Sequence, residues 1–391
     1  MERVVITGMA ALTPIGNDLE TIEKNLKNGV CGLTNTDEFD EISVCGKVSI
    51  NLEDFLKKRD VRYYSRFINL ARIAARQALS DSKILDSVKP DDISLSFASA
   101  IGGAESFENN IGAHRAQPTF IPSILPSSAA SMIAIDNALR GDVFVYNAAC
   151  AGGNVAIGEA FNKIRRGEAK YCLAGASDAS ITVSAVKGFS SMCALSREKD
   201  INKASIPFDA NRTGFVIAEG AAFFVLESLG SALLRNAKIY GEITSFTQSM
   251  DAIHITAPDQ SGKSQKRCIS KIFADNVKRE DITYISAHGT STKLNDAAES
   301  TAISDIFGNI PVVATKSLTG HMLSASPAVE TAFCLLSLKG FIPPTINITE
   351  IDPQCNINLN KTLIETEINS ILNLSFGFGG FNTALVIKKF K

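Results

Sequence analysis

The chain has 391 residues, of which 45% are apolar and 20% charged, the profile of a folded protein with a sizeable core. Its 39 basic and 41 acidic side chains give a net charge of −2, so the overall charge does not favour nucleic acid or a membrane surface as a partner. No apolar run approaches the roughly 18 residues that a membrane span needs, and the apolar start is too short and broken for a signal peptide.

The cysteine pattern points away from disulfide and metal frameworks. The eight cysteines form no Cys-x-x-Cys pair and no zinc-finger spacing. In a chain of this length they are typical of buried, reduced thiols, and we therefore expect a cytosolic protein. Clustered ligands such as His-x-x-x-His are also missing from the sequence, so we expect no metal site.

Strands and helices alternate in the first part of the chain, as the spacing of apolar residues indicates. We expect strands over 3–10, 92–100, 142–149 and 171–180, and helices over 16–29, 66–80 and 153–167. The segment 213–228 reads as two short strands joined at Glu219-Gly220.

A second part with a similar order of elements follows a plausible seam at 229–237. We expect strands over 238–246, 282–289 and 312–317, helices over 263–276, 295–307 and 327–339, and a final pair of strands over 357–362 and 383–390. The alternation predicts layered α/β architecture with mainly parallel sheets. We expect two topologically similar halves, 1–234 and 235–391, packed as one unit because no flexible linker separates them.

Cys150 is the first candidate for chemistry. It lies in YNAACAGGN, residues 146–154, at an expected strand-to-helix junction. A helix N-terminus favours an anion and would lower the pKa of this thiol. Its small neighbours would let backbone N–H groups approach a bound carbonyl, as an oxyanion hole requires. The alternative is an ordinary buried cysteine, since free cysteine is among the most buried residue types.

Two of the four histidines occupy matching positions. His288 in ISAHGTST and His321 in SLTGHMLSASP each follow an expected apolar strand and lie beside a glycine. Strand ends are where α/β proteins assemble their sites. A single histidine of this kind is more often structural. Two of them, together with Cys150, favour a nucleophile served by two imidazoles.

A series of ordered motifs, from VVITGMAALTPIGND to LSFGFGGFNTALVIKKF, resembles the elongating β-ketoacyl-[acyl carrier protein] synthases of the thiolase superfamily. The series includes ACAGGNVAIGEAF, PFDANRTGFVIAEG, DAIHITAP, AHGTSTKLNDAAES and TKSLTGHMLSASPAVE. The resemblance implies a thiolase-like, five-layered αβαβα fold and no metal, nucleotide or flavin cofactor. It also implies a decarboxylative condensation of malonyl-carrier with an acyl group held on the enzyme, giving a 3-oxoacyl-carrier.

The same resemblance assigns the central residues. Cys150 would be the acylated nucleophile, and His288 and His321 would complete a Cys-His-His triad as mainly neutral hydrogen-bond donors to the enolate oxygen. The backbone N–H groups of Cys150 and Phe378 would hold the charge on the acyl carbonyl. Phe378, between glycines, would also gate the acyl pocket.

Further positions match the family more loosely. Lys316 would support the triad electrostatically, with Glu299 as its acidic partner, although isolated charges are more often solvated. Thr290 and Thr292 would bind the pantetheine arm, or merely stabilise a turn. The remaining two assignments concern the acyl pocket, where ordinary core is the alternative: Ile101 and Phe189.

The chain departs from the common family pattern around these residues. Phe381 replaces the usual threonine after FGFGG, and SASP, residues 324–327, replaces GAAG after His321. Cys150 is followed by AGG, where a hydroxyl residue usually comes second. Thr213 and Ala218 also differ from the usual aspartate and glycine. Phenylalanine after FGFGG also occurs in polyketide ketosynthases, so a specialised polyketide or polyene pathway is an open alternative to fatty acid synthesis.

The expected partners are an acidic acyl carrier protein and a second ketosynthase-like subunit. The segment 57–76 is rich in Lys and Arg, and within it Arg62 and Arg66 are candidates for carrier docking, or simply a solvated helix face. The resemblance implies a dimer with a continuous sheet, either a homodimer or a heterodimer of which this chain is the active half.

Three other functions remain to be weighed. A non-catalytic chain-length subunit would typically lack the nucleophile, and Cys150 with both histidines argues against it. An initiating synthase would have asparagine in place of His321, and a degradative thiolase would have a second catalytic cysteine there.

Overall fold

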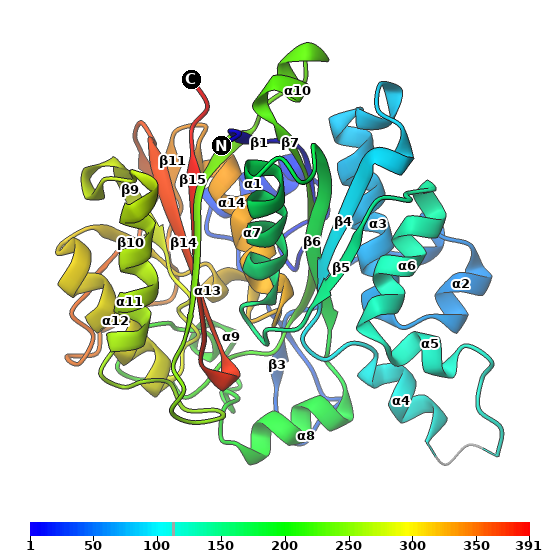
Figure 1. The fold of residues 1–391 in the computed structure, drawn as a ribbon. Helices are drawn as coiled ribbons and strands as arrows, with labels where there is room; N and C mark the ends of the chain where they lie inside the picture. Colours follow the sequence, from blue (N-terminus) through cyan, green and yellow to red (C-terminus); the bar gives the residue numbers. More distant parts are fainter. Residues whose placement is uncertain (112–113) are drawn as a thin grey trace.

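A computed structural model describes residues 1–111 and 114–391 (Figure 1). Its framework is one long mixed sheet whose strand order is β12 (Asn358–Leu359), β10 (Pro311–Val313), β9 (Ile282–Ser286), β14 (Ser370–Gly377), β15 (Phe381–Lys388), β8 (Gly241–Met250), β1 (Val4–Leu12), β7 (Glu219–Ser228), β6 (Tyr171–Ala179), β4 (Ile93–Ala98) and β5 (Val143–Tyr146). Strands β1 and β7 are buried along their whole length, so both faces of the sheet must be covered there.

The sheet consists of two halves with the same topology. The five strands of each half can be ranked from first to fifth by their order in the chain. Across the sheet, β5-β4-β6-β7-β1 and β10-β9-β14-β15-β8 then have the same order of ranks: third, second, fourth, fifth, first. The first three strands of each series pair in parallel, and the last three pair antiparallel. The expected similarity in element order is therefore present in the fold, but the expectation of mainly parallel sheets is wrong. The halves join through the short pairing of β1 with β8.

The two halves of the sheet and three layers of helices make five layers, as the resemblance implied. The central layer holds α7 (Gly152–Arg165) and α14 (Ala325–Ser337), which contact strands of both halves and each other (Figure 1). Every residue of α14 is buried. One outer layer, on the strands of the first half, holds α3 (Arg66–Ser82) and α6 (Pro126–Asn137). The other outer layer holds α11 (Lys263–Ser270) and α12 (Lys293–Phe307), with α11 against β8 and β15.

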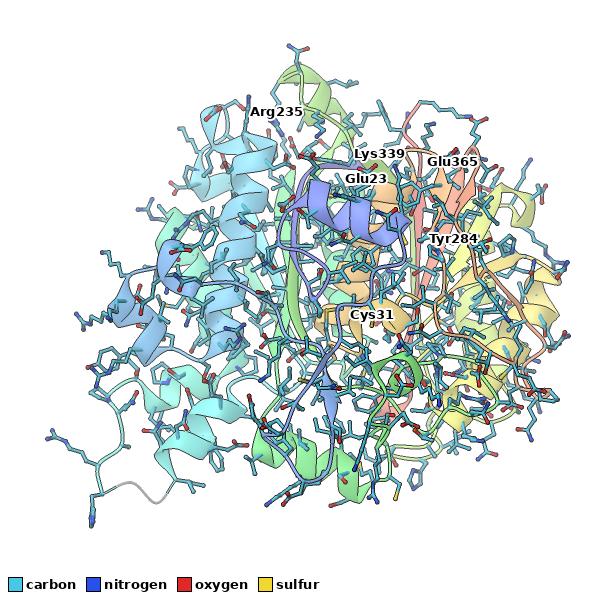
Figure 2. All side chains as sticks on the ribbon, turned by 180° about the vertical axis from the view of Figure 1, so that it is seen from behind. Glu23, Cys31, Arg235, Tyr284, Lys339 and Glu365 are labelled. Carbon is cyan, nitrogen blue, oxygen red and sulfur yellow. The ribbon has the colours of Figure 1, made fainter. Side chains whose placement is uncertain are left out.

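Shorter elements complete the fold. They comprise the small sheets β2 (Thr34–Asn35) with β3 (Val44–Cys45) and β11 (Phe341–Ile342) with β13 (Ile364–Glu365), and the helices α1 (Leu19–Lys27), α2 (Lys58–Tyr63), α4 (Ala104–Asn110), α5 (Phe120–Ile124), α8 (Val183–Ser191), α9 (Ile201–Ala204), α10 (Leu229–Leu234) and α13 (Lys316–Thr319). Figure 2 shows Glu23 on α1 beside Lys339, just after α14, and the two form an ion pair that ties α1 to the central layer.

Several expected elements differ from those observed. The segment 213–228 forms only one strand, β7, since residues 215–218 make isolated bridges to three separate partners instead of a strand. The strand expected over 312–317 stops at Val313, and Lys316 begins the single-turn helix α13. The final two strands do not pair, because β12 lies beside β10 whereas β15 lies between β14 and β8. Strand β14 was not expected at all.

The described residues contain no helix that is both long and apolar enough to cross a membrane. No two of the eight cysteines form a disulfide, and all but Cys31 and Cys193 are buried, which confirms the expectation of mostly buried cysteines.

Candidate active site

The candidate nucleophile lies at the junction between β5 and α7. Cys150 lies two residues before the first residue of α7 and is 7% exposed, so the expected strand-to-helix placement is confirmed. Ala149 adopts φ 46°, a left-handed conformation that alanine rarely takes, and this turns the chain sharply into the helix. The end of β14 presses against the turn, because a side chain at Gly377 would meet the Ala148 carbonyl oxygen at 2.8 Å and the Cys150 nitrogen at 3.1 Å.

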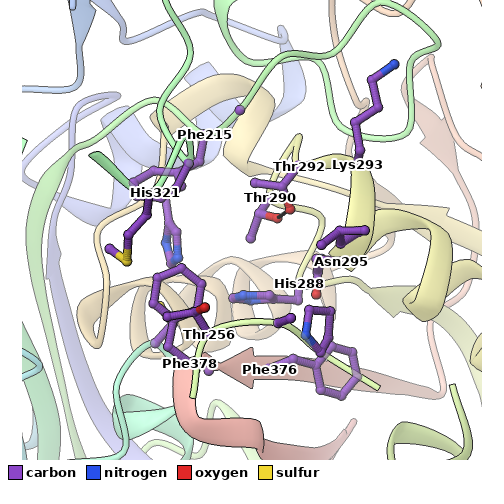
Figure 3. Close-up of a pocket in the computed structure, with 18 of the residues that line it drawn as sticks. Phe215, Thr256, His288, Thr290, Thr292, Lys293, Asn295, His321, Phe376 and Phe378 are labelled. Atoms are coloured by element: carbon purple, nitrogen blue, oxygen red, sulfur yellow. Dashed lines mark hydrogen bonds between the residues drawn. The ribbon is translucent and has the colours of Figure 1, made fainter. Parts of the chain in front are cut away.

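Both candidate histidines share a cavity of about 270 Å³ with Cys150. His288 follows β9 and His321 lies between α13 and α14, both in the second half of the fold. Cys150 comes from the first half, so the two halves meet at this cavity. The ring centroids of the two imidazoles are 5.3 Å apart at an interplanar angle of 84°. Figure 3 shows the two rings converging on one space. The sequence therefore identified three side chains that the structure brings together.

Lys316 is buried beside this pair. Its Nζ lies 3.4 Å from His288 Nδ1 and donates to the His288 carbonyl oxygen at 2.5 Å. It also donates to Glu330 Oε1 at 2.6 Å, and each of these two side chains is only 1% exposed. The acidic partner of Lys316 is thus Glu330, which the sequence reasoning did not single out, and the expected pairing with Glu299 is wrong.

Glu299 has a different task. Its two carboxylate oxygens accept the backbone N–H groups of His288 and Gly289, at 2.7 and 2.8 Å. Glu299 therefore anchors the turn that carries His288 and does not pair with Lys316. Burial raises the pKa of Glu299 to about 8, against the lowering effect of the hydrogen bond from Gly289.

Burial also dominates the protonation of the triad. Desolvation, followed by the Lys316 charge, holds the pKa of His288 and of His321 well below the ordinary range, so both imidazoles are neutral near pH 7. Desolvation raises the pKa of Cys150 to about 12, although the Lys316 charge and the N–H groups of Phe378 and Cys150 lower it. The expectation of a lowered thiol pKa is therefore wrong, because the cost of burial outweighs the lowering by Lys316 and these two N–H groups.

The Phe378 and Cys150 N–H groups favour the anionic sulfur because they point toward it. The same two donors are available to an oxygen bound at this position, which is the arrangement an oxyanion hole requires. Ser375 on β14 links Cys150 to His288, since its hydroxyl donates to the Cys150 carbonyl oxygen at 3.0 Å and lies 3.3 Å from His288 Nδ1.

The remaining walls of the cavity include three of the looser assignments. Thr290 and Thr292 line it, with hydroxyl oxygens 2.9 Å apart (Figure 3). Phe189 also lines it, and its ring packs on Phe378 at 6.3 Å and on Phe215 at 5.3 Å. The Phe215 ring in turn packs edge-on against His321 at 5.2 Å. A continuous aromatic wall therefore leads from the expected gate to one histidine.

Ile101 and the two arginines lie outside this cavity. Ile101 is 37% exposed, on the loop before α4, and its N–H contacts Asp178 at 3.4 Å. Arg62 is exposed on α2. Arg66 is held by an internal bidentate ion pair, with both bonds to the Glu219 carboxylate at 2.7 Å, so its charge is largely committed within the protein.

Asp178 is a further buried group that the sequence reasoning missed. Its carboxylate accepts the Ser324 N–H at 2.8 Å, while the Ser324 hydroxyl donates to the Ala149 carbonyl oxygen at 2.6 Å. The loop that follows His321 is thereby fastened to the turn that carries Cys150. Burial raises the pKa of Asp178 to about 7.

Comparisons with known proteins agree with this arrangement. The models for "Beta-ketoacyl synthase, N-terminal domain" and "Beta-ketoacyl synthase, C-terminal domain" match residues 1–232 and 240–349. The chain is 38% identical to the 3-oxoacyl-[acyl-carrier-protein] synthase 2 of Staphylococcus aureus (strain COL), over 100% of this chain and 99% of that protein.

The solved structures that share the whole fold include two ketosynthases, each aligned over 100% of both chains. One is the ishigamide ketosynthase/chain length factor, at 31% identity and a TM-score of 0.92. The other is a ketosynthase bound to a hexaketide, in complex with its type II polyketide acyl-carrier protein, at 30% identity and a TM-score of 0.91.

Proposed function

Since this chain belongs to the beta-ketoacyl synthase family, we propose that it is a 3-oxoacyl-[acyl-carrier-protein] synthase with Cys150 as its nucleophile. The observation that carries the proposal is the shared cavity in which Cys150 faces two neutral imidazoles. Neutral imidazoles suit hydrogen-bond donation to a developing enolate, and the buried sulfur suits a covalent thioester that water must not reach.

The reaction begins with transfer of the acyl group. The Cys150 sulfur attacks the acyl-carrier thioester, a new sulfur–carbonyl bond forms, and the carrier thiol leaves with the proton that Cys150 loses. The Phe378 and Cys150 N–H groups stabilise the negative charge on the carbonyl oxygen. Because the pKa of the resting thiol is about 12, its proton must leave as the attack proceeds, and the Lys316 charge favours this loss.

Condensation follows when malonyl-carrier occupies the same cavity. Its carboxylate leaves as carbon dioxide, and the electron pair moves into an enolate whose oxygen accepts hydrogen bonds from His288 and His321. The enolate carbon attacks the Cys150 thioester, the carbon–sulfur bond breaks, and the thiolate takes up one proton. The product is a 3-oxoacyl-carrier lengthened by two carbons.

A second subunit fits the exposed edge strand. On β5, the side chains of Val143 and Val145 are 46% and 38% exposed. An edge strand with exposed apolar side chains and unpaired backbone groups favours pairing with another chain. Ile101 lies near this edge, since Asn147 donates to the neighbouring Ala100 carbonyl oxygen at 2.9 Å. We infer that another ketosynthase-like chain pairs with β5 and covers Ile101. In that assembly Ile101 would line the acyl pocket together with Phe189.

The carrier protein fits the cationic surface of α2. Arg66 and Arg72 form ion pairs within the protein. Arg62 is exposed, as are three other basic residues close to it in the chain: Lys57, Lys58 and Arg59. These side chains would attract an acidic carrier and raise its rate of encounter. The pantetheine arm would then pass Thr290 and Thr292 on its way to Cys150. We further propose a cytoplasmic location and a division of the chain into halves at 234/235.

The test is to incubate the purified protein with malonyl-carrier and a panel of saturated and polyunsaturated acyl-carriers of short, medium and long chain. Mass spectrometry of the carrier would detect 3-oxoacyl products, and the preferred acyl group would separate fatty acid from polyketide or polyene synthesis. The proposal fails if no member of the panel is extended, alone or with a ketosynthase-like partner subunit. It also fails if Cys150→Ala extends the panel as well as the unaltered chain does.

A further inference from the structure

The SASP segment after His321 introduces a hydroxyl group directly behind the histidine ring. Ser326 Oγ lies 3.0 Å from His321 Nδ1 and accepts the backbone N–H of Met322 at 2.8 Å. Ser326 and Met322 are 0% exposed and His321 is 2% exposed, so water does not compete for these contacts. The common GAAG pattern has no hydroxyl at this position.

The direction of the bond between Ser326 and His321 follows from the other partner of the hydroxyl. A backbone N–H can only donate, so the Met322 contact occupies a lone pair on Oγ and leaves the hydroxyl proton free. Among the described residues, His321 Nδ1 is the only acceptor within hydrogen-bonding distance of that proton. If Nδ1 donated instead, a fully buried hydroxyl proton would have no partner, which is unfavourable.

We propose that Ser326 is a positioning residue that holds His321 in the tautomer with its proton on Nε2. This inference rests on the proposed function and explains how His321 becomes a donor there. Nδ1 must accept a hydrogen bond from the serine hydroxyl and therefore carries no proton of its own. In a neutral imidazole the single ring proton then lies on Nε2. Nε2 makes no hydrogen bond to any described residue, and the ring lines the cavity that Cys150 shares.

The packing around His321 keeps the ring from turning over. Phe215 contacts it edge-on at 5.2 Å and His288 at 5.3 Å, and its backbone N–H and carbonyl bond to residues 216 and 218. The Nε2–H is thus directed toward the cavity before any substrate arrives. Donors oriented in advance stabilise a developing oxyanion without the cost of reorganising at the moment of reaction.

The most direct test reads the tautomer itself. The chain has only four histidines, so selective ¹⁵N-histidine labelling gives a simple NMR spectrum, and the signals that vanish in His321→Asn belong to His321. In the unaltered protein we expect a pyrrole-like Nε2 and a pyridine-like Nδ1. A pyrrole-like Nδ1 there overturns the inference, whether or not any variant folds.

Ser326→Ala should then populate both tautomers and slow the release of carbon dioxide from malonyl-carrier about tenfold, the effect of losing about one hydrogen bond in the transition state. Acylation of Cys150 should change less, since it does not use the enolate donors. Ser326→Thr keeps the hydroxyl and should restore the single tautomer. An unchanged tautomer in Ser326→Ala overturns the inference.

Ser337→Ala is the matched control. Ser337 lies on the same helix, is fully buried and has a hydroxyl with no hydrogen-bond partner among the described residues. It should leave the tautomer and the rate unchanged. If the unaltered protein shows the Nε2–H tautomer but extends no acyl group, the proposed function fails and this inference stands. If the protein extends acyl groups with a pyrrole-like Nδ1, only this inference fails.

Discussion

Lys316 Nζ lies 2.6 Å from Glu330 Oε1, and each of these side chains is 1% exposed. A buried ion pair is costly to break from one side, because the remaining charge is left without a counter-ion. Glu330→Gln should therefore lower the free energy of unfolding by about 3–5 kcal/mol, measured by urea denaturation at one fixed protein concentration.

Two further variants sharpen this prediction. Glu365→Gln, at an exposed position on β13, should change stability by no more than about 0.5 kcal/mol. Lys316→Met combined with Glu330→Leu removes both charges and should be more stable than Glu330→Gln, although condensation should remain slow without the lysine. Equal stability of Glu330→Gln and Glu365→Gln would show that the pair is not buried as described.

Glu299 predicts a pH dependence of stability. Burial raises its pKa from the ordinary 4.5 to about 8 in the folded protein. Between these values the folded state binds a proton that the unfolded state has released, so this group makes stability fall as pH rises, by up to about 1.4 kcal/mol per pH unit. The free energy of unfolding, measured by urea denaturation from pH 5 to 8, should fall less steeply in Glu299→Gln. Parallel curves for the two proteins would contradict the assignment.

Gly152 and Ser324 form a second testable pair. A β-carbon at Gly152 would lie 2.4 Å from the Ser324 hydroxyl oxygen, so the serine on the histidine loop fills the space that a side chain at 152 would need. Gly152→Ser should destabilise the protein by about 1–3 kcal/mol through overpacking. Adding Ser324→Gly should recover much of this loss, as a double-mutant cycle of thermal unfolding would show. Additive losses would mean that the two positions do not compete for space.

The edge strand predicts the oligomeric state. Val145→Lys places a charge on the exposed face of β5 and should convert the protein to monomers in light scattering coupled to gel filtration. Leu234→Lys on α10 is the control, since this residue is 89% exposed and its helix packs on β1 and β7, which are separated from β5 by β6 and β4. A dimer that survives Val145→Lys but not Leu234→Lys would place the interface elsewhere.

The sequence predicted much of this site because its main residues follow strands or begin helices. Cys150 and His288 stand at such junctions, whereas His321 lies between α13 and α14 and not directly after a strand as expected. The family motifs identified His321 all the same, as they did Lys316. Glu330 was missed, although a usable signal existed: it is the only charged residue in the apolar segment that forms α14. A lone carboxylate in an otherwise apolar helix needs a buried partner.

Other features could not be read from local patterns. Apolar spacing identifies a strand but not the direction or identity of its neighbour, so the antiparallel pairings of β7 with β1 and of β15 with β8 were not foreseen. The pKa of Cys150 depends on the desolvation of its whole surroundings, which a single helix N-terminus does not reveal. Arg66 appeared solvated because its partner, Glu219, lies far away in the sequence.

The claim that Cys150 and both imidazoles work as one unit is tested most directly by charging and then discharging the enzyme. The protein is first loaded from an acyl-carrier that it accepts, the acyl group is located by mass spectrometry of peptides, and malonyl-carrier is then added. We predict a label on Cys150 that malonyl-carrier removes as a 3-oxoacyl-carrier, and a label that stays in place in His288→Ala and His321→Ala. A label on another residue, or normal discharge in either histidine variant, would contradict the account.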